Sequence, residues 1–251
     1  MTAEAQPGTV YLTGAGPGAP DLLTLRALRL LQTADVILPD DLVPDEILAL
    51  ASPSALIIPV GKRCGQPRIT QEGIHALMLE HATTRSGHSA RSVLRLKSGD
   101  PLVYGRAAEE IDFLAAHSIP FEIVPGITAA FAAAAELRTP LTDRSSASKL
   151  IFVTAHHAAP KPGVHDKIAL TPHWHGPFPP DATLVVYMPG RRFRALADEL
   201  IASGIDPATP CAAVSRASTP QQHVHRTTLA TLADDAPGPS PVLLLIGHAI
   251  R

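Results

Sequence analysis

Short apolar runs recur through the first half of the chain, separated by polar turns and by segments with helical spacing. The runs that we expect to form strands are Val10–Leu12, Val36–Leu38, Leu56–Val60, Val93–Leu96 and Phe121–Val124. Between them, Leu22–Gln32 and Gln71–His81 carry apolar residues with the period of a helix. Strands that alternate with helices in this way predict a mostly parallel sheet with crossover helices.

A second series of apolar runs follows in the other half of the chain. Its strand candidates are Leu150–Thr154, Thr183–Tyr187, Cys211–Ser215 and Val242–Ile246, with a helix at Arg192–Ile205. Pro125-Gly126 breaks the periodicity between the two series, and residues 158–180 are rich in Pro, Gly and His, as in a long loop. We therefore expect two α/β domains, residues 1–125 and residues 126–251.

Composition narrows the class of protein. The chain has 251 residues, of which 45% are hydrophobic, and a formal net charge of −2. That charge argues against a general nucleic-acid binder. The segment Met1–Pro7 lacks the basic and apolar regions of a signal peptide, and no apolar run reaches the roughly 20 residues that span a bilayer. Cys64 and Cys211 form no CxxC motif. We expect a cytoplasmic protein with no membrane and no nucleic-acid partner.

The glycine-rich segment Gly14–Asp21 lies between an apolar run and a helical pattern, where a backbone can approach a ligand closely. It matches the dinucleotide fingerprint, and Asp40 follows at roughly the 20-residue spacing of a ribose-binding acid. However, Pro17 has no N–H for a pyrophosphate, and Pro20-Asp21 resembles a helix cap placed after the glycines. A small-molecule cofactor and a tight turn without ligand both remain open.

Three further strand ends carry candidate chemistry. In Ser98-Gly99-Asp100, Gly99 allows close approach and Asp100 could accept from a ribose or an amino group; the alternative is a plain Asp-Pro turn. Asp40 and Asp41 follow Leu38, and one of these carboxylates could act as a base unless both lie in a surface turn. Lys62 and Arg63 could bind or protonate an anionic substrate, or be merely solvated.

Basic and histidine side chains suggest two less specific sites. Several basic residues follow strand ends or glycine loops, and if they converge they predict a substrate with several carboxylates or phosphates. They are Lys62, Arg63, Arg68, Lys97, Arg106, Arg144, Arg191 and Arg192. A second group, His156, His157, His165, His173 and His175, crowds one segment. Its spacing matches no familiar metal motif, so we expect no metal.

Taken together, the ordered motifs are similar to those of one enzyme family. They are Val10–Leu38 with its GAGPG loop, Val60–Gly65, Leu96–Arg106, Pro120–Ala135, Thr139–Arg144, Phe152–His156 and Thr183–Met188. Across nearly the whole length, the chain resembles the uroporphyrinogen-III C-methyltransferases, a branch of the tetrapyrrole methyltransferases that use S-adenosyl-L-methionine (SAM). The resemblance implies the class III methyltransferase fold, with two α/β domains, a cofactor cleft between them and a homodimeric assembly.

The resemblance also implies roles for individual residues. The implied cofactor contacts are Pro17, Ser98, Gly99, Asp100, Val103, Thr128, Ala129, Met188 and Ala217. Asp40 matches the proposed proton acceptor of the family and Lys62 its proposed proton donor. The implied reaction methylates uroporphyrinogen III at ring carbons 2 and 7 to give precorrin-2, for sirohaem or cobalamin biosynthesis. It needs no metal.

The chain departs from the family pattern at one point beside the implied base. The family commonly has Tyr-Asp-Arg where this chain reads Pro39-Asp40-Asp41, so an arginine suited to substrate carboxylates is replaced by an acid. Ser98, Leu102, Asp143, Pro189 and Ala217 also differ from the usual residues. These changes keep two alternatives open: a methyltransferase for another precorrin or tetrapyrrole, and a catalytically weakened protein that binds SAM or tetrapyrrole. A third alternative, a dinucleotide-dependent oxidoreductase, rests only on the glycine spacing and Asp40.

Overall fold

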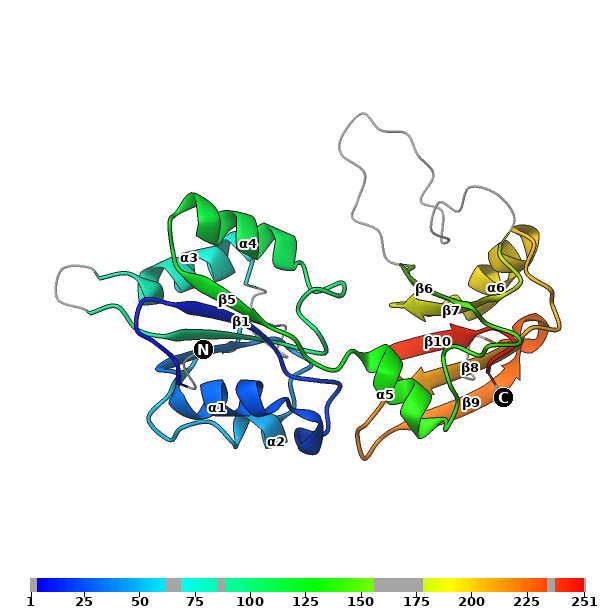
Figure 1. Cartoon of the computed structure of the whole chain (residues 1–251), viewed down its shortest axis with the longest axis horizontal. Coiled ribbons are helices and arrows are strands. Elements are labelled where there is room, and N and C mark those ends of the chain that lie inside the picture. The colour runs from blue at the N-terminus through cyan, green and yellow to red at the C-terminus, as the bar shows by residue number, and fades with distance from the viewer. Residues whose placement is uncertain (1–3, 62–68, 85–88, 156–177, 234–237, 251) are drawn as a thin grey trace. The chain divides into compact units, whose positions relative to one another are not determined.

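The computed structural model describes residues 4–61, 69–84, 89–155, 178–233 and 238–250. The chain divides into two compact units, Met1–Thr128 and Ala129–Arg251, and each unit has its own sheet (Figure 1). Both sheets have five strands with helices on both faces. The predicted fold class, with two α/β domains, is therefore confirmed.

The first unit contains a fully parallel sheet in the strand order β3-β2-β4-β1-β5. The strands are β1 (Val10–Gly14), β2 (Val36–Pro39), β3 (Leu56–Ile57), β4 (Val93–Lys97) and β5 (Phe121–Val124). All five coincide with predicted runs, although β3 is shorter than its apolar run. Because β4 and β1 lie inside the sheet, every residue of both strands is buried. Their carboxyl ends meet at one edge, where open parallel sheets bind ligands.

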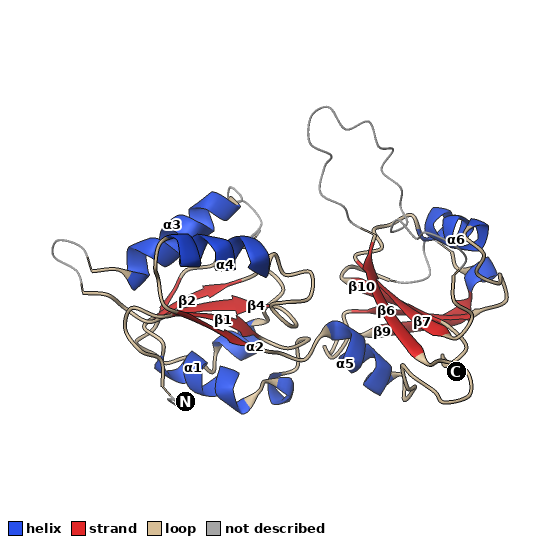
Figure 2. Ribbon diagram, turned by 45° about the horizontal axis from the view of Figure 1, so that its top comes forward, coloured by secondary structure: helices blue, strands red, loops and turns tan. Residues whose placement is uncertain are grey.

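Helices cover both faces of this sheet (Figure 2). One face carries α1 (Leu25–Thr33) and α2 (Asp45–Leu48), and the other carries α3 (Gln71–Ala82) and α4 (Ala107–Ala116). Leu30 packs in the cluster on the first face, and Met78 and Leu114 pack in the cluster on the second. Within the described residues, no helix is both long and apolar enough to cross a membrane.

The start of α1 differs from the prediction. A 3-10 turn occupies Pro20–Leu22, and Leu23 is then extended with ψ 140°. The helix begins only at Leu25, where the hydroxyl of Thr24 accepts the N–H of Ala27 at 3.1 Å. The interpretation of Pro20-Asp21 as the helix cap is therefore wrong. Because the extended residue separates the turn from the helix, Thr24 provides the cap.

The second unit has a mixed sheet in the order β6-β7-β10-β8-β9, in which only β6 and β7 run parallel. Its strands are β6 (Lys149–Thr154), β7 (Ala182–Tyr187), β8 (Pro210–Ser215), β9 (His223–Thr228) and β10 (Val242–Ile246). The edge strand β9 was not predicted, because its sequence HVHRTT is polar and no residue of the strand is buried. Antiparallel pairing lets such an edge face water.

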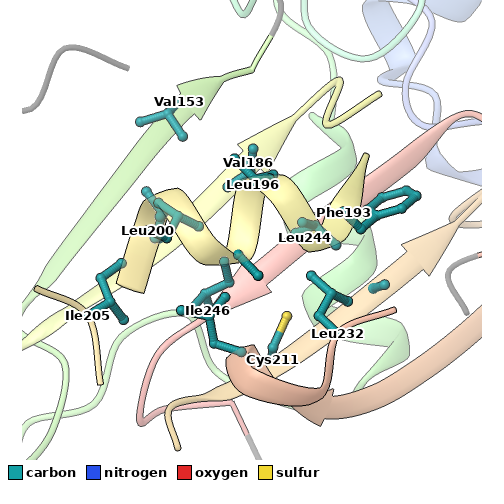
Figure 3. Close-up of a cluster of buried hydrophobic side chains, with 14 of the residues drawn as sticks. Val153, Val186, Phe193, Leu196, Leu200, Ile205, Cys211, Leu232, Leu244 and Ile246 are labelled. Carbon is teal, nitrogen blue, oxygen red and sulfur yellow. The ribbon is translucent and has the colours of Figure 1, made fainter. Parts of the chain in front are cut away.

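Two helices pack on opposite faces of the second sheet. In the cluster of Figure 3, Leu196 and Leu200 of α6 (Phe193–Ala202) pack with Val186 and Leu244 of the strands. On the other face, the alanine-rich α5 (Ala129–Glu136) packs against strand residues that include Val185. Small alanine side chains let α5 approach the sheet closely, and the central strand β10 is buried along its whole length.

Candidate functional site

Three glycine-containing segments meet at the carboxyl edge of the first sheet. The N–H of Gly16 donates to the carbonyl of Gly99 at 3.1 Å, and the N–H of Gly99 donates back at 2.7 Å. A Cβ added to Gly14 would lie 2.5 Å from the carbonyl oxygen of Gly99 and 2.6 Å from Cα of Gly126. Only glycine fits at Gly14, and the structure brings the two predicted binding loops into direct contact.

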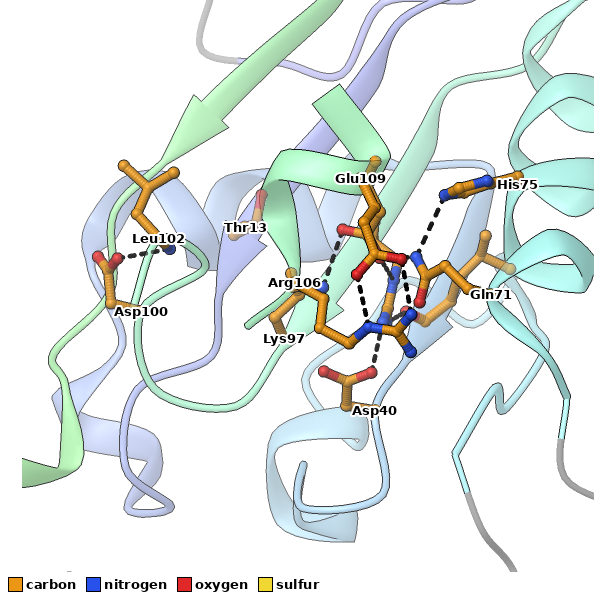
Figure 4. Close-up of polar contacts among 12 residues, drawn as sticks. Thr13, Asp40, Gln71, His75, Lys97, Asp100, Leu102, Arg106 and Glu109 are labelled. Carbon is orange, nitrogen blue, oxygen red and sulfur yellow. Dashed lines mark hydrogen bonds and ion pairs between the residues drawn. The ribbon is translucent and has the colours of Figure 1, made fainter. Parts of the chain in front are cut away.

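Asp100 holds this edge together. Its Oδ1 accepts the N–H of Leu102 at 2.8 Å (Figure 4), and its Oδ2 accepts the N–H of Gly126 at 3.0 Å. The carboxylate therefore connects the loop after β4 to the end of β5. Each carboxylate oxygen can still accept a second hydrogen bond, so this structural role leaves capacity for a ligand donor.

The loop after β4 has an unusual backbone. Tyr104 and Arg106 adopt left-handed conformations, with φ of 54° and 57°, and Gly99 has φ 68°. Non-glycine residues in this region cost about 1–3 kcal/mol each and concentrate at ligand and active sites. Leu102 is 59% exposed in the same loop. The loop therefore combines backbone strain with an exposed apolar side chain.

The other predicted cofactor contacts in the first unit lie on neighbouring segments. Pro17, Ser98 and Val103 are half-buried, and Thr128 is buried. The N–H of Val103 donates to the carbonyl of Asp100 at 3.2 Å, which closes a turn. These residues sit on the loops that follow β1, β4 and β5.

Asp40 follows β2 at the same edge, and its N–H donates to the carbonyl of Leu96 at 2.9 Å. A pocket of about 310 Å³ opens beside it. Its lining includes Asp40, Asp41, Asp45 and Gly61, together with Pro39, Val43, Pro44, Leu48 and Pro59. The pocket is thus acidic in the described part of the chain. Lys62, the predicted proton donor, directly follows Gly61 and lies outside the described residues.

Asp40 contacts a network of buried charged side chains (Figure 4). Arg95 of β4 donates from Nη2 to Oδ1 of Asp40 at 2.5 Å and from Nε to Oε1 of Glu110 at 2.9 Å. Lys97 donates from Nζ to Oε2 of Glu110 at 2.8 Å. The side chains of Arg95, Lys97 and Glu110 are 3%, 2% and 0% exposed. Two positive and two negative groups therefore balance each other.

The surroundings shift the pKa values of Glu110 and Lys97 for different reasons. Burial works against ionisation of Glu110, but the charges of Arg95 and Lys97 outweigh it and lower the pKa of that carboxyl. Burial, followed by repulsion from Arg95, lowers the pKa of Lys97. Because Lys97 is buried and paired with Glu110, its interpretation as one of a converging set of substrate-binding cations is wrong.

Sequence reasoning missed Arg95 and Glu110. The signal was present, because Arg95 and Lys97 interrupt an apolar run whose every position is buried, and buried charges require partners. Among the other predicted basic residues, Arg106 forms two hydrogen bonds with Glu109, at 2.8 and 2.6 Å, on the exposed start of α4. Arg144, Arg191 and Arg192 belong to the second unit, and Arg63 and Arg68 lie outside the described residues.

The second unit carries the remaining predicted contacts. Ala129 is the first residue of α5. Met188 directly follows β7, is 46% exposed and has a left-handed φ of 49°. Ala217 is 9% exposed and lies between Arg216 and Ser218, which have φ of 48° and 62°. Strained backbone therefore accompanies Met188 and Ala217, as it does the loop after β4.

The histidines considered as a metal site, His156, His157, His165, His173 and His175, lie outside the described residues. Where the structure describes the chain, no three His, Cys, Asp or Glu side chains gather as a metal ion would require.

Comparison with known proteins relates this arrangement to one family. The chain is 44% identical over 99% of its length to the uroporphyrinogen-III C-methyltransferase of Paracoccus denitrificans and spans 83% of that protein. It is 43% identical over 98% of its length to the chloroplastic S-adenosyl-L-methionine-dependent uroporphyrinogen III methyltransferase of Arabidopsis thaliana. The chain spans 64% of the plant protein and about half of a siroheme synthase from Nitrosococcus oceani.

Solved structures and a family model agree with these relatives. The fold matches the native form of uroporphyrin III C-methyl transferase from Thermus thermophilus with a TM-score of 0.76 and 39% identity, covering 97% of this chain and 99% of that one. Residues 9–233 match the model of the tetrapyrrole (corrin/porphyrin) methylases. That match extends through most of both units and includes every predicted site residue, and so this chain belongs to the tetrapyrrole methylase family.

Proposed function

We propose that this protein transfers methyl groups from SAM to ring carbons 2 and 7 of uroporphyrinogen III, giving precorrin-2 for sirohaem or cobalamin biosynthesis. One observation carries the proposal: Asp40 and its pocket share the carboxyl edge of a single parallel sheet with the two glycine loops. The names of the similar proteins from Paracoccus and Arabidopsis point to the same substrate.

The residues at this edge suit a ligand with a polar nucleoside part and a methionine part that carries a sulfonium. The contacts among Gly14, Gly99 and Gly126 bring three backbone segments closer together than side chains would allow. Asp100 retains acceptor capacity for hydroxyl or amino groups. When bound, SAM supplies an electrophilic methyl group. We assign its contacts to Pro17, Ser98, Gly99, Asp100, Val103 and Thr128, with Ala129, Met188 and Ala217 from the second unit.

Asp40 is assigned the part of the base. As a pyrrole carbon forms its bond to the methyl carbon, positive charge develops on the ring, and a nearby carboxylate stabilises that charge. The Asp40 carboxylate then accepts the proton that the ring system loses. Lys62 is assigned as the proton donor. Most of the remaining rate enhancement comes from orientation, because a sulfonium is already a good leaving group.

We further propose a domain boundary near residue 125 and a cytoplasmic homodimer that requires no metal and binds neither membranes nor nucleic acid. A net charge of −2 supports the last point, because nucleic-acid binders are usually basic. Pro125-Gly126, where the chain leaves β5, supports the proposed boundary.

A second candidate function is methylation of another precorrin or tetrapyrrole. The observation that favours it is the acidic lining of the pocket, where Asp41 and Asp45 stand beside Asp40. Carboxylates at these positions repel the carboxylate side chains of uroporphyrinogen III. A substrate that presents fewer acid groups to this wall would bind better.

Anaerobic incubation with SAM and uroporphyrinogen III, followed by mass spectrometry of the oxidised products, separates these candidates. We expect the addition of two methyl groups. No addition, with SAM binding demonstrated by calorimetry, would contradict the proposed substrate and direct the assay to other precorrins. Binding of NADH without binding of SAM would support a dinucleotide-dependent oxidoreductase instead.

A further inference from the structure

Arg95 is surrounded by acceptors on three sides. Its Nη2 donates to Asp40, its Nη1 to the carbonyl of Leu38 at 3.0 Å, and its Nε to Glu110. The guanidinium group is planar and rigid, so these bonds fix its plane as well as its position. A rotation that released Asp40 would also weaken at least one bond to a buried acceptor, which is costly in a dry interior.

Glu110 anchors the other end of this arrangement. Its carboxylate accepts from Lys97 at 2.8 Å and from Nε2 of Gln71 at 3.3 Å, in addition to Arg95. Because these donors come from α3 and β4, the Glu110 carboxylate is held from two elements. The Glu110 carboxylate therefore holds the guanidinium of Arg95 in a fixed position.

Asp40 differs from the other charged groups of the network. Its side chain is 33% exposed, against 3% or less for Arg95, Lys97 and Glu110. Asp40 alone among these four lines the pocket. A buried charge network is a weak source of stability compared with apolar packing, and its best attested benefit is a specified geometry. Among Asp40, Arg95, Lys97 and Glu110, the group whose orientation affects the pocket is therefore the Asp40 carboxylate.

We infer that Arg95, supported by Glu110, is a positioning residue that holds the Asp40 carboxylate in its productive orientation toward the pocket. Its bond to Oδ1 restrains the side chain of Asp40, which is 33% exposed and lines the pocket. This inference rests on the proposed function in assigning catalysis to Asp40. It adds a role for a residue that itself touches neither substrate nor cofactor.

A double-mutant cycle on methyl transfer tests the inference. Arg95→Lys keeps the charge but cannot reproduce the planar fork, so we expect kcat to fall about 10- to 100-fold while the KM for SAM changes by less than about twofold. In the background of Asp40→Asn, the same substitution should change kcat by less than about threefold. An equal loss in both backgrounds would overturn the inference, because it would indicate a general structural role.

Arg26→Lys is the matched control. Arg26 forms an ion pair with Glu122 in the same unit, but both side chains are more than a third exposed. We expect this variant to keep the kcat of the wild type. If Arg95→Lys does not fold, Glu110→Gln replaces it, because this change removes the carboxylate charge that anchors Nε of Arg95. The same loss of kcat, absent in the Asp40→Asn background, is expected.

A crystal structure of Arg95→Lys, or of Glu110→Gln, provides a readout that needs no substrate. We expect the Asp40 side chain to leave the orientation that it has in a wild-type crystal. An unchanged Asp40 carboxylate would overturn the inference even if kcat falls. If the wild type transfers no methyl group, the proposed function fails, whereas the crystallographic comparison still decides the role of Arg95.

Discussion

Gly16 and Gly99 exchange a pair of backbone hydrogen bonds just beyond the ends of the parallel strands β1 and β4. The carbonyl of Lys97 accepts a further bond from the N–H of Ala15 at 2.7 Å. The two loops are therefore joined by backbone contacts that extend the sheet on the proposed ligand side. A side chain that separates the loops would disturb the strands and the site together.

Gly14→Ala tests this relationship. The added Cβ would lie 2.5 Å from the carbonyl oxygen of Gly99 and 2.6 Å from Cα of Gly126. Both are backbone atoms, which cannot rotate away as a side chain can. We expect a loss of about 3 kcal/mol in the free energy of unfolding, at the upper end of ordinary overpacking. We also expect SAM affinity to fall at least about tenfold. Urea denaturation and calorimetry measure the two effects.

Gly204→Ala is the control for Gly14→Ala. Gly204 has φ +99° and nothing within 4 Å of an added Cβ, so only backbone strain of about 1–2 kcal/mol opposes alanine there. SAM affinity should stay unchanged. If Gly14→Ala were no more costly than Gly204→Ala, the close contact between the loops would not be required.

Asp40→Asn removes the proposed base while keeping its size. We expect kcat for methyl transfer to fall about 100-fold or more, as when general base catalysis is lost, with SAM affinity unchanged. The control is Asp112→Asn on the exposed surface of α4. Full turnover by Asp40→Asn in a stopped-time mass-spectrometric assay would exclude the role assigned to Asp40.

Glu110→Gln tests the buried charges through stability. The variant leaves Arg95 and Lys97 with an uncompensated positive charge, so we expect a loss of about 3 kcal/mol in the free energy of unfolding. The neighbouring Glu109 pairs with Arg106 on an exposed surface, where such pairs contribute at most about 1 kcal/mol. Glu109→Gln is therefore the control. Similar losses in both variants would contradict the buried network.

The stability difference between the wild type and Glu110→Gln should also depend on pH. Because the pKa of Glu110 is lowered from its usual 4.5 in the folded protein, its contribution is complete above that pH and is lost as the pH falls through the folded value. The stability difference between wild type and Glu110→Gln should therefore shrink below pH 4.5. A difference independent of pH would indicate that the loss arises from packing.

The sequence predicted the first sheet well and the second less well, for a physical reason. Parallel strands are buried on both faces, so Val10–Leu12 of β1 and Val36–Leu38 of β2 form uninterrupted apolar runs. The edge strand β9 carries the polar residues of a water-facing surface and gives no such signal. It pairs antiparallel with the preceding strand β8, and apolar periodicity contains no signal for this pairing.

The candidate site shows a similar division. The glycine loops and Asp40 were found because they stand at strand ends, and strand ends can be located from the apolar pattern. Arg95 and Glu110 act through contacts between β4 and α4, which no spacing rule connects. The interpretation of Lys97 failed for the same reason, because its partner lies on a helix that had not been predicted.

Thr24→Ala tests the corrected start of α1. The hydroxyl of Thr24 accepts the N–H of Ala27, so its loss should cost about 1 kcal/mol of unfolding free energy. Asp21→Ala serves as the control, since Asp21 is exposed in the preceding 3-10 turn and should contribute less than about 0.5 kcal/mol. Urea denaturation of the two variants distinguishes the two caps. A greater loss for Asp21→Ala would restore the original interpretation.

Cys211 makes stability sensitive to alkaline pH. Burial among apolar side chains raises the pKa of its thiol to about 12 from the ordinary 9.0, so the unfolded chain ionises first. The contribution of Cys211 is therefore complete below pH 9 and is lost between pH 9 and 12. From pH 8 to 10.5, Cys64→Ser should lose about 2 kcal/mol more unfolding free energy than Cys64→Ser/Cys211→Ala. Equal losses in urea titrations would show that the thiol ionises in the folded protein.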